Sequence, residues 1–344
     1  MGHFSIAHLP RHWYVACKSE ELRDQPLART MLDVPLVLFR DAGGEPRALI
    51  DRCAHRNVPL SKGAVMAGKL VCGYHGWCYD GEGQVIGVPA LVGDPTGKAR
   101  RVSRYATKEK QGYVWVWLDP DKEPDKEPYT VPGIGLPGYD TIRYESDIPA
   151  TLHAAAENVL DVPHTAFLHK GLFRGTGTPN KITAKILRTG VMAQAEYVGE
   201  PRPSGWIGRF LAPGGGTVEH FDRFVLPSIA EVEYRLGADN HLVVTSLLTP
   251  ISDFVTRLFA AASFKLRVPH AIVNAALKPL AQRVLTQDIE ILGAQTESVK
   301  RFEGEQFVST DVDILGPHIW RLLKQAERGE EPDERYEAEV ELMA

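Results

Sequence analysis

The sequence predicts an α+β protein of two domains, in which an all-β N-terminal domain precedes a domain built on an antiparallel sheet flanked by helices. Three observations predict this class. Short apolar runs separated by Gly, Pro, Asp and Asn fill the first third of the chain, and a charged, proline-rich stretch follows them. Strand patterns then return between two helical segments. A chain of 344 residues is long enough for two such cores.

The N-terminal domain is expected to occupy residues 1–120. Its strand candidates are rich in the β-branched and aromatic residues that pack well in sheets. They are HWYVA, VPLVLF, RALIDR, KLVCGY and YVWVWL. The stretch DPDKEPDKEP follows, with its charges and three prolines. It has little to bury and cannot join a sheet ladder, so we expect a linker at residues 121–130.

The second domain is expected to span residues 131–328. A helix is predicted from Thr151 to Val162, because Asp147 or Thr151 can cap its start and Pro163 ends it. Mostly antiparallel strands should follow. Their patterns are KITAKI, VMAQAEYV, HFDRFVL, AEVEYRL and HLVVTSLL. The Gly-rich PGGGT among them lacks the Lys-Ser/Thr of a phosphate loop, so it is interpreted as a turn.

The last part of the chain is predicted to be helical from Phe254 to Arg301. Its apolar stretch 254–285 has two interpretations, a lid with peripheral membrane contact or the plain core of the domain. The tail at residues 329–344 is strongly acidic, and this composition predicts disorder.

Composition narrows the function classes. With 39 Lys+Arg against 44 Asp+Glu, the net charge of −5 gives no electrostatic reason to expect a nucleic-acid partner. The N-terminus lacks a basic start before an apolar core, and no apolar run reaches the ~18 residues that span a bilayer. A soluble, cytoplasmic protein is therefore expected. Four cysteines are too few for a disulfide scaffold, which leaves reduced thiols or metal ligation.

Two short motifs pair a cysteine with a histidine. They are Cys53-Ala54-His55 and Cys72-Gly73-Tyr74-His75, each in a turn-rich segment after a predicted strand. Two thiolates and two imidazoles can bind structural zinc or a Rieske [2Fe-2S] cluster, and spacing alone does not decide between them. One ligand of each kind per loop suits a binuclear cluster, in which both Cys bind one iron and both His bind the other.

A second polar group lies at the end of the predicted helix. Asn158, Asp161 and His164 recur every three residues, which places them roughly on one side. His164 and His169 are about 140° apart on an ideal helix. They can therefore share one metal only if the helix distorts or ends between them, as Pro163 encourages. Non-haem Fe(II) oxygenases use two His and one carboxylate, with open positions for O₂ and substrate.

The carboxylate must come from elsewhere in the chain, and the segment LTQDIEILGAQ offers two candidates. Asp288 lies one turn from Leu285 and Leu292 on an apolar stripe, whereas Glu290 has small and polar neighbours. A carboxylate on an apolar face is costly unless it is paired or bound to a metal. Asp288 is therefore favoured, with Glu290 as the alternative.

Both groups of motifs resemble one family. CAHRNVPLSKG and CGYHGWCYDGEG resemble the two cluster-binding loops of Rieske-type ring-hydroxylating oxygenases. E-N-x-x-D-x-x-H-x-x-x-x-H resembles the iron signature of their catalytic domain, and a late helix with Q-D resembles its carboxylate donor. The resemblance implies a helix-grip, START-like second domain and two sets of ligands. The cluster ligands would be Cys53, His55, Cys72 and His75, with Arg56 and Trp77 beside them, and the mononuclear iron ligands would be His164, His169 and Asp288.

The resemblance also implies how electrons reach the iron. Asp161 would link an iron-bound His to a cluster His of the neighbouring subunit, next to Asn158, in a homotrimer typical of short oxygenases that lack a β subunit. The alternative for Asn158 and Asp161 is a polar patch at a helix end with no electron role. The chain has no G-x-G-x-x-G or second Cys cluster. A separate ferredoxin or NAD(P)H-dependent reductase is therefore expected as the electron donor.

The implied function is that of the terminal oxygenase component, a non-haem iron monooxygenase that hydroxylates or oxidatively demethylates an apolar small molecule. A lipophilic polycyclic such as a sterol is the first substrate expectation, because the pocket strands offer few basic residues apart from Arg209, Arg223 and Arg235. The alternative substrate is a compact aromatic acid such as a methoxybenzoate. An alternative from another class is a Rieske electron carrier with a non-catalytic second domain.

Overall fold

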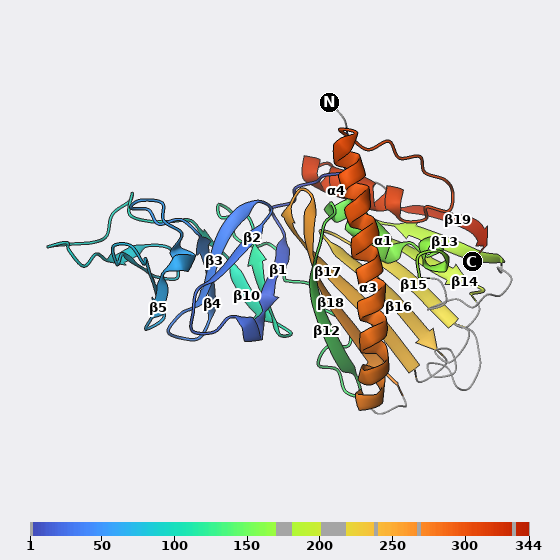
Figure 1. Ribbon diagram of the computed structural model, residues 1–344, viewed down its shortest axis with the longest axis horizontal. Coiled ribbons are helices and arrows are strands. Elements are labelled where there is room, and N and C mark those ends of the chain that lie inside the picture. Colours follow the sequence, from blue (N-terminus) through green and yellow to red (C-terminus); the bar gives the residue numbers. More distant parts are fainter. Residues whose placement is uncertain are drawn as a thin grey trace. The chain divides into compact units, whose positions relative to one another are not determined.

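The computed structural model has two compact units of α+β class, which confirms the predicted fold class (Figure 1). One unit comprises Pro10–Thr130, and the other comprises Met1–Leu9 with Val131–Ala344. The structure describes residues 3–169, 181–200, 218–236, 240–266, 270–331 and 335–343. The Gly-rich PGGGT and Arg209 lie outside these ranges.

The N-terminal unit consists of three small antiparallel sheets, ordered β1-β11-β10, β2-β3-β4-β9 and β5-β6-β7-β8. The five predicted strand runs coincide with β1, β3, β4, β6 and β11. The strands are β1 (Trp13–Lys18), β2 (Leu27–Met31), β3 (Val34–Arg40), β4 (Pro46–Ile50), β5 (Ala64–Met66), β6 (Lys69–Val71), β7 (Cys78–Tyr79), β8 (Val85–Gly87), β9 (Arg104–Tyr105), β10 (Thr107–Lys110) and β11 (Tyr113–Trp117), with 3-10 turns η1 (Ser19–Glu21) and η2 (Leu60–Lys62).

Strand β3 separates two hydrophobic clusters of this unit. Leu36 and Leu38 face the cluster under β1 and β11, whereas Val37 and Phe39 face the cluster under the two Cys-His loops. All four side chains are fully buried, because the apolar run VPLVLF supplies residues to both faces of the strand. The second cluster therefore gives the two loops a rigid apolar base.

The C-terminal unit is built on one antiparallel sheet of eight strands, ordered β12-β18-β17-β16-β15-β14-β13-β19. One face is buried, since every second residue of β13 is buried and the residues between them are exposed or half-buried. The strands are β12 (Asp140–Ile148), β13 (Lys181–Arg188), β14 (Met192–Val198), β15 (Val218–Val225), β16 (Ile229–Leu236), β17 (Asn240–Ser252), β18 (Val255–Lys265) and β19 (Tyr336–Met343).

Helices α1 (Leu152–Leu160), α3 (His270–Arg301) and α4 (Gly316–Arg328) pack on the buried face, and the 3-10 turn η3 (Pro163–Ala166) follows α1. Figure 1 shows α3 crossing this face of the sheet. Fully buried Ala155 and Ala156 of α1 belong to the same core as Ala230 of β16, since small side chains allow helix and sheet to approach closely. Among the described residues, no helix has the length and apolar character needed to span a membrane.

The predicted helix from Phe254 was wrong in its first third. Residues 255–265 form β18, which pairs with β12 on one side and β17 on the other, and α3 begins only at His270. The Ala-rich run LFAAAS suits a helix by propensity, but pairing on both edges overrides that local preference. Residues 255–265 are part of the sheet, so they cannot belong to a lid formed by residues 254–285.

The predicted disorder of the acidic tail was also wrong. Tyr336–Met343 forms β19, which extends the sheet by pairing with β13. Val340 and Leu342 pack on the core, while the alternating glutamates are exposed. The period-two alternation is a strand signal, and the prediction from acidic composition alone ignored it.

Residues 1–9 also differ from the predicted first domain, because they belong to the C-terminal unit. Ala7 and Leu9 join its core, and Ser5 donates from its backbone to Glu305 at 2.8 Å. At the other boundary, residues 121–130 have no regular structure. They are nevertheless attached to the N-terminal unit, since the Lys126 carbonyl accepts a hydrogen bond of 2.6 Å from the Trp13 indole.

Candidate metal centres

The two Cys-His motifs occupy turns of matching geometry. The Asn57 N–H donates to the Cys53 carbonyl at 2.9 Å, and the Gly76 N–H donates to the Cys72 carbonyl at 3.0 Å. Asn57 and Gly76 have φ values of 61° and 69°, the left-handed conformation that Gly and Asn adopt most readily. Each turn thereby presents one Cys and one His from the same short loop.

Close backbone contact holds the two loops together. A Cβ added to Gly63 would lie 2.0 Å from the Val71 carbonyl oxygen, so the chain after the first loop touches the strand before the second loop directly. Only glycine permits that approach. The SKG ending of the first motif therefore has a specific packing role.

Four side chains, which we call the cluster quartet, converge at the tips of these loops. Its thiols are buried, and burial raises the pKa of the Cys72 thiol. Its two imidazole rings lie with their centroids 4.6 Å apart. The members are Cys53, His55, Cys72 and His75.

The quartet fits a [2Fe-2S] cluster bound by two Cys and two His. The Nδ1 atom of His55 is buried and has no hydrogen-bond partner among the described residues, a state that costs free energy unless a ligand such as a metal satisfies it. The cysteines are nearly inaccessible, whereas His75 is exposed. The sulfur end of the site therefore faces the core and the imidazole end faces solvent.

Two aromatic residues support the quartet. Trp77 stacks on the His55 ring at 4.7 Å with an interplanar angle of 2°, which fixes the orientation of the imidazole. The Tyr79 hydroxyl lies 3.1 Å from the Cys53 sulfur and accepts a hydrogen bond from the Ala54 N–H at 3.0 Å. Trp77 was expected beside the cluster. Tyr79 was missed, although an aromatic residue in the short strand after the second motif is a natural packing partner.

The second site begins where α1 ends. Thr151 caps the helix, with its side-chain oxygen accepting from the Ala154 N–H at 3.1 Å. The helix stops at Leu160, Asp161 is extended, and Pro163 starts the turn η3. The helix therefore ends before both histidines and not between them, so the angular spacing of an ideal helix no longer separates His164 from His169.

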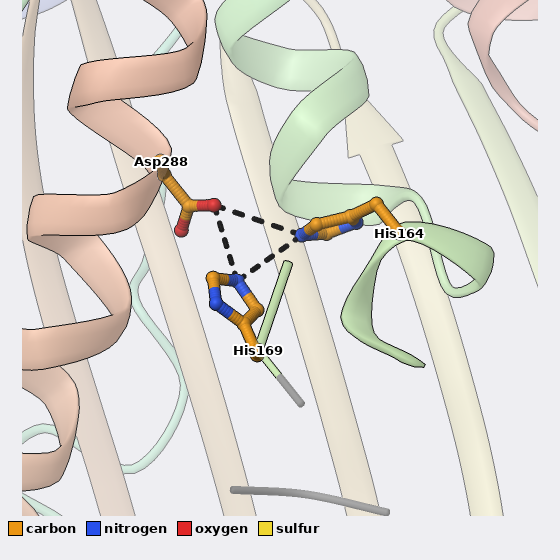
Figure 2. A group of neighbouring side chains, drawn as sticks. All are labelled: His164, His169 and Asp288. Carbon is orange, nitrogen blue, oxygen red and sulfur yellow. Dashed lines mark hydrogen bonds and ion pairs between the residues drawn. The ribbon is translucent and has the colours of Figure 1, made fainter. Parts of the chain in front are cut away.

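His164, His169 and Asp288, which we call the iron triad, converge from two separate elements (Figure 2). Asp288 comes from α3 and both histidines from the segment after α1. His169 Nε2 is 3.3 Å from His164 Nε2 and 3.1 Å from Asp288 Oδ1, and the third separation is 3.7 Å. Three donors at about 2.1 Å from one ion would have such separations. The triad thus fits a mononuclear metal bound on one face.

Each member of the iron triad has a polar partner. The Gln287 amide oxygen lies 3.0 Å from His169 Nδ1, and the Asn158 amide donates to Asp288 at 3.5 Å. Asp161 accepts from the His164 backbone N–H at 3.0 Å, and its carboxylate is 3.2 Å from His164 Nδ1. Such partners fix the orientation of ligands and tune the metal.

Electrostatics at the triad favours a cation. Burial lowers the pKa of His164, but the carboxylates of Asp161 and Asp288 outweigh burial and raise it to about 9. A metal ion would supply the positive charge that these carboxylates otherwise draw from a proton. Glu290, the alternative ligand, is exposed and does not belong to the triad, whereas Asp288 is buried.

Gln287 was not predicted as a functional residue. The signal was its position directly before Asp288. Neighbouring helix residues lie about 100° apart, so nothing in the sequence indicated that both side chains would lie near one metal. His153, which had no predicted role, is buried, and its Nε2 lies 2.9 Å from the Gly316 carbonyl. The contact of Asp161 with a neighbouring subunit stays a prediction.

Two family models match the chain, the Rieske [2Fe-2S] domain at residues 12–105 and the vanillate O-demethylase oxygenase C-terminal domain at residues 148–329. Among known proteins, the oxygenase component of dicamba O-demethylase from Stenotrophomonas maltophilia is 34% identical over 46% of this chain. The chain matches only 47% of that relative's length. The vanillate O-demethylase oxygenase subunit of Pseudomonas sp. strain HR199 is 24% identical over 90% of this chain and 92% of the relative.

Solved structures resemble the chain over almost its full length. Dicamba monooxygenase bound to dicamba aligns with a TM-score of 0.80, at 23% identity, over 94% of this chain and 98% of that one. This similarity establishes the shared fold. The matched segments include all members of the cluster quartet and of the iron triad.

Proposed function

The chain belongs to the family of Rieske oxygenases that carry the vanillate O-demethylase oxygenase C-terminal domain, and from this premise we propose that it is the terminal oxygenase component of a multicomponent system. The cluster quartet would hold the [2Fe-2S] cluster, and the iron triad would hold a mononuclear Fe(II). The convergence of two imidazoles and one buried carboxylate within 3.7 Å carries this proposal, because an electron-transfer domain needs no such site.

When bound, the cluster delivers single electrons and the iron activates O₂, so that one oxygen atom enters a C–H bond and the other leaves as water with two electrons and two protons. The chain's own residues hold the geometry. Asp161 and Gln287 fix the rings of His164 and His169, and Asn158 supports the carboxylate of Asp288. The three donor atoms would occupy one face of an Fe(II) ion, and such a ligand set would leave coordination positions for O₂ and substrate.

The substrate class that we propose is a compact aromatic carrying an O-methyl or N-methyl group. Hydroxylation of the methyl carbon gives an unstable product, which breaks into formaldehyde and the demethylated compound. The two relatives described above are named as O-demethylases, of dicamba and of vanillate. The sterol expectation has less support, because part of its presumed lid is strand β18, which is paired with β12 on one side and β17 on the other.

Electrons would come from a separate ferredoxin or NAD(P)H-dependent reductase. We further propose a homotrimer in which Asp161 connects the iron triad of one subunit with the cluster of the next. The Asp161 side chain is 28% exposed, and its carboxylate contacts His164. The same side chain therefore touches the iron triad and is accessible to a neighbouring subunit.

The test is a single turnover. The iron-replete protein is reduced chemically without oxygen, mixed with methoxybenzoates, methoxyphenols and a methylated sterol, and exposed to O₂, and products are identified by mass spectrometry. A demethylated aromatic with equimolar formaldehyde is the expected result. A hydroxylated sterol would overturn the substrate class. If neither the wild type nor His164→Ala formed product, and the cluster were oxidised at the same rate in both, the result would favour a Rieske electron carrier with a non-catalytic second domain.

A further inference from the structure

A row of polar and aromatic side chains crosses the buried face of the sheet. Tyr197, His220 and Tyr234 lie opposite one another on β14, β15 and β16. Tyr197 belongs to the core that packs against α1, so this row faces the helices. Asp222 follows His220 on the same face of β15, because residues two apart on a strand share a face. Buried charges inside an apolar core call for a functional explanation.

His220 is fully engaged within this row. Its Nδ1 lies 2.6 Å from the Glu200 carboxylate, and its Nε2 lies 2.9 Å from the Asp222 carboxylate. Its ring stacks between Tyr197 at 4.7 Å and Tyr234 at 4.2 Å. Burial lowers the pKa of His220, but the two carboxylates raise it to about 10, so both ring nitrogens donate. The imidazolium has no proton left for a ligand.

Unused hydrogen-bonding capacity remains on Tyr197 and Asp222. The Tyr197 hydroxyl is buried and makes no hydrogen bond of normal geometry with the described residues. Burial raises the pKa of Asp222, and His220 and the nearby Tyr197 hydroxyl oppose that effect. Asp222 is 1% exposed, and only its Oδ1 contacts His220. A phenol and a carboxylate oxygen thus lie together in the core with lone pairs to spare.

This pair lies toward the iron triad. Tyr197 belongs to the same core cluster as Leu160 and Val162, which flank Asp161. Asp161 in turn contacts His164 directly. Helix α1, which leads into the triad, packs on β15 and β16. Arg223 and Arg235 alternate with this row and therefore point to the other face, where they pair with glutamates.

We propose that Tyr197 and Asp222 form a substrate subsite that accepts an O–H or N–H group carried by the aromatic ring. A carboxylate oxygen of Asp222 accepts a hydrogen bond from the O–H or N–H group of the ligand. The Tyr197 hydroxyl either accepts a hydrogen bond from that group or donates one to the ligand's oxygen. A ligand carboxylate at this position would meet the negative charges of Asp222 and Glu200 instead. The subsite rests on the proposed function, because it selects among compact aromatics held beside the iron triad.

The test is equilibrium binding by calorimetry to the oxidised, iron-replete protein, without turnover. The probes are 2-methoxyphenol, 1,2-dimethoxybenzene, which lacks the hydroxyl proton, and 2-methoxybenzoate, which replaces the hydroxyl by a carboxylate. The phenol should bind about tenfold more tightly than the dimethoxy compound, as one buried hydrogen bond predicts. Tyr197→Phe and, separately, Asp222→Asn should remove most of that difference.

If Tyr197 and Asp222 had only a structural role, their substitution would weaken the binding of all probes together. The readout is therefore the ratio of the dissociation constants of the first two probes. Tyr139→Phe is the matched control, since its hydroxyl bonds to His241 elsewhere in the sheet and the ratio should not change. Equal binding of the first two probes, tightest binding of the benzoate, or no binding of the phenol at millimolar concentration would each overturn the proposal. Tight phenol binding without formaldehyde in a turnover would instead contradict the proposed demethylation and leave the subsite intact.

Discussion

Removal of one hydroxyl beside the cluster quartet should lower the cluster's reduction potential. In Tyr79→Phe the fully buried ring remains, but the contact of 3.1 Å with the Cys53 sulfur is lost. Burial, followed by the hydrogen bond to Cys53, raises the pKa of Tyr79, so the hydroxyl keeps its proton. Because the Ala54 N–H already donates to the phenol oxygen, that proton is directed at the sulfur.

The magnitude follows from the charge on the sulfur. One-electron reduction makes the cluster more negative, and hydrogen bonds to charged groups exceed neutral ones by about 1 kcal/mol. For a one-electron couple this difference corresponds to a decrease of about 40 mV. Tyr79→Phe also removes the acceptor of the Ala54 N–H. This loss is the same in both redox states of the cluster, so it should affect the stability of the fold and not the reduction potential.

The assay is a redox titration of the cluster, followed by the electron paramagnetic resonance signal of its reduced state. Tyr105→Phe is the matched control, because Tyr105 lies in the other hydrophobic cluster of the same unit. Its potential should remain within about 10 mV of the wild type, a small fraction of the shift expected from one hydrogen bond. A potential in Tyr79→Phe that is unchanged or higher would refute the assigned direction of the hydrogen bond.

Three further predictions concern the C-terminal unit. Asp288→Ala should lose about one iron per chain and keep both cluster irons, as measured by metal analysis. The control Glu290→Ala changes an exposed residue and should keep all three irons. Equal iron content in the two variants would exclude Asp288 as a ligand. Gln287→Leu should weaken iron binding about 10–100-fold in competition with a chelator, because His169 loses its partner, and full affinity would make that contact incidental. Val340→Asp should lower the melting temperature by about 4–8 °C, since it places a charge on the packed face of β19. Exposed Glu339→Asp should leave the melting temperature unchanged, and equal shifts would argue against the pairing of β19 with the sheet.

The ligand pattern could be predicted because it depends on local spacing. The two Cys-His pairs and the proline after α1 impose turns at fixed positions, and the apolar neighbours of Asp288 distinguish it from Glu290. The partners Tyr79 and Gln287 were not predictable in the same way. Their roles depend on how separate elements approach one another, which the sequence does not specify directly.

The errors in the fold have the same origin. Residues 255–265 look helical in isolation, but β12 and β17 provide hydrogen-bonding partners on both sides. The tail 336–343 looks too acidic to fold, but its glutamates occupy only the exposed positions of a strand. In both cases pairing between distant segments decided the outcome, and composition over a short window could not reveal it.

The most direct test of the central claim follows the cluster signal and the product in one experiment. The fully reduced, iron-replete protein is mixed with 2-methoxyphenol and then with O₂, and the loss of the reduced-cluster signal and the formation of formaldehyde are measured in the same samples. The account predicts that both proceed at one rate in the wild type, and that His169→Ala forms no formaldehyde. Formaldehyde from His169→Ala at the wild-type yield would contradict the assignment of the iron triad as the site of oxygenation.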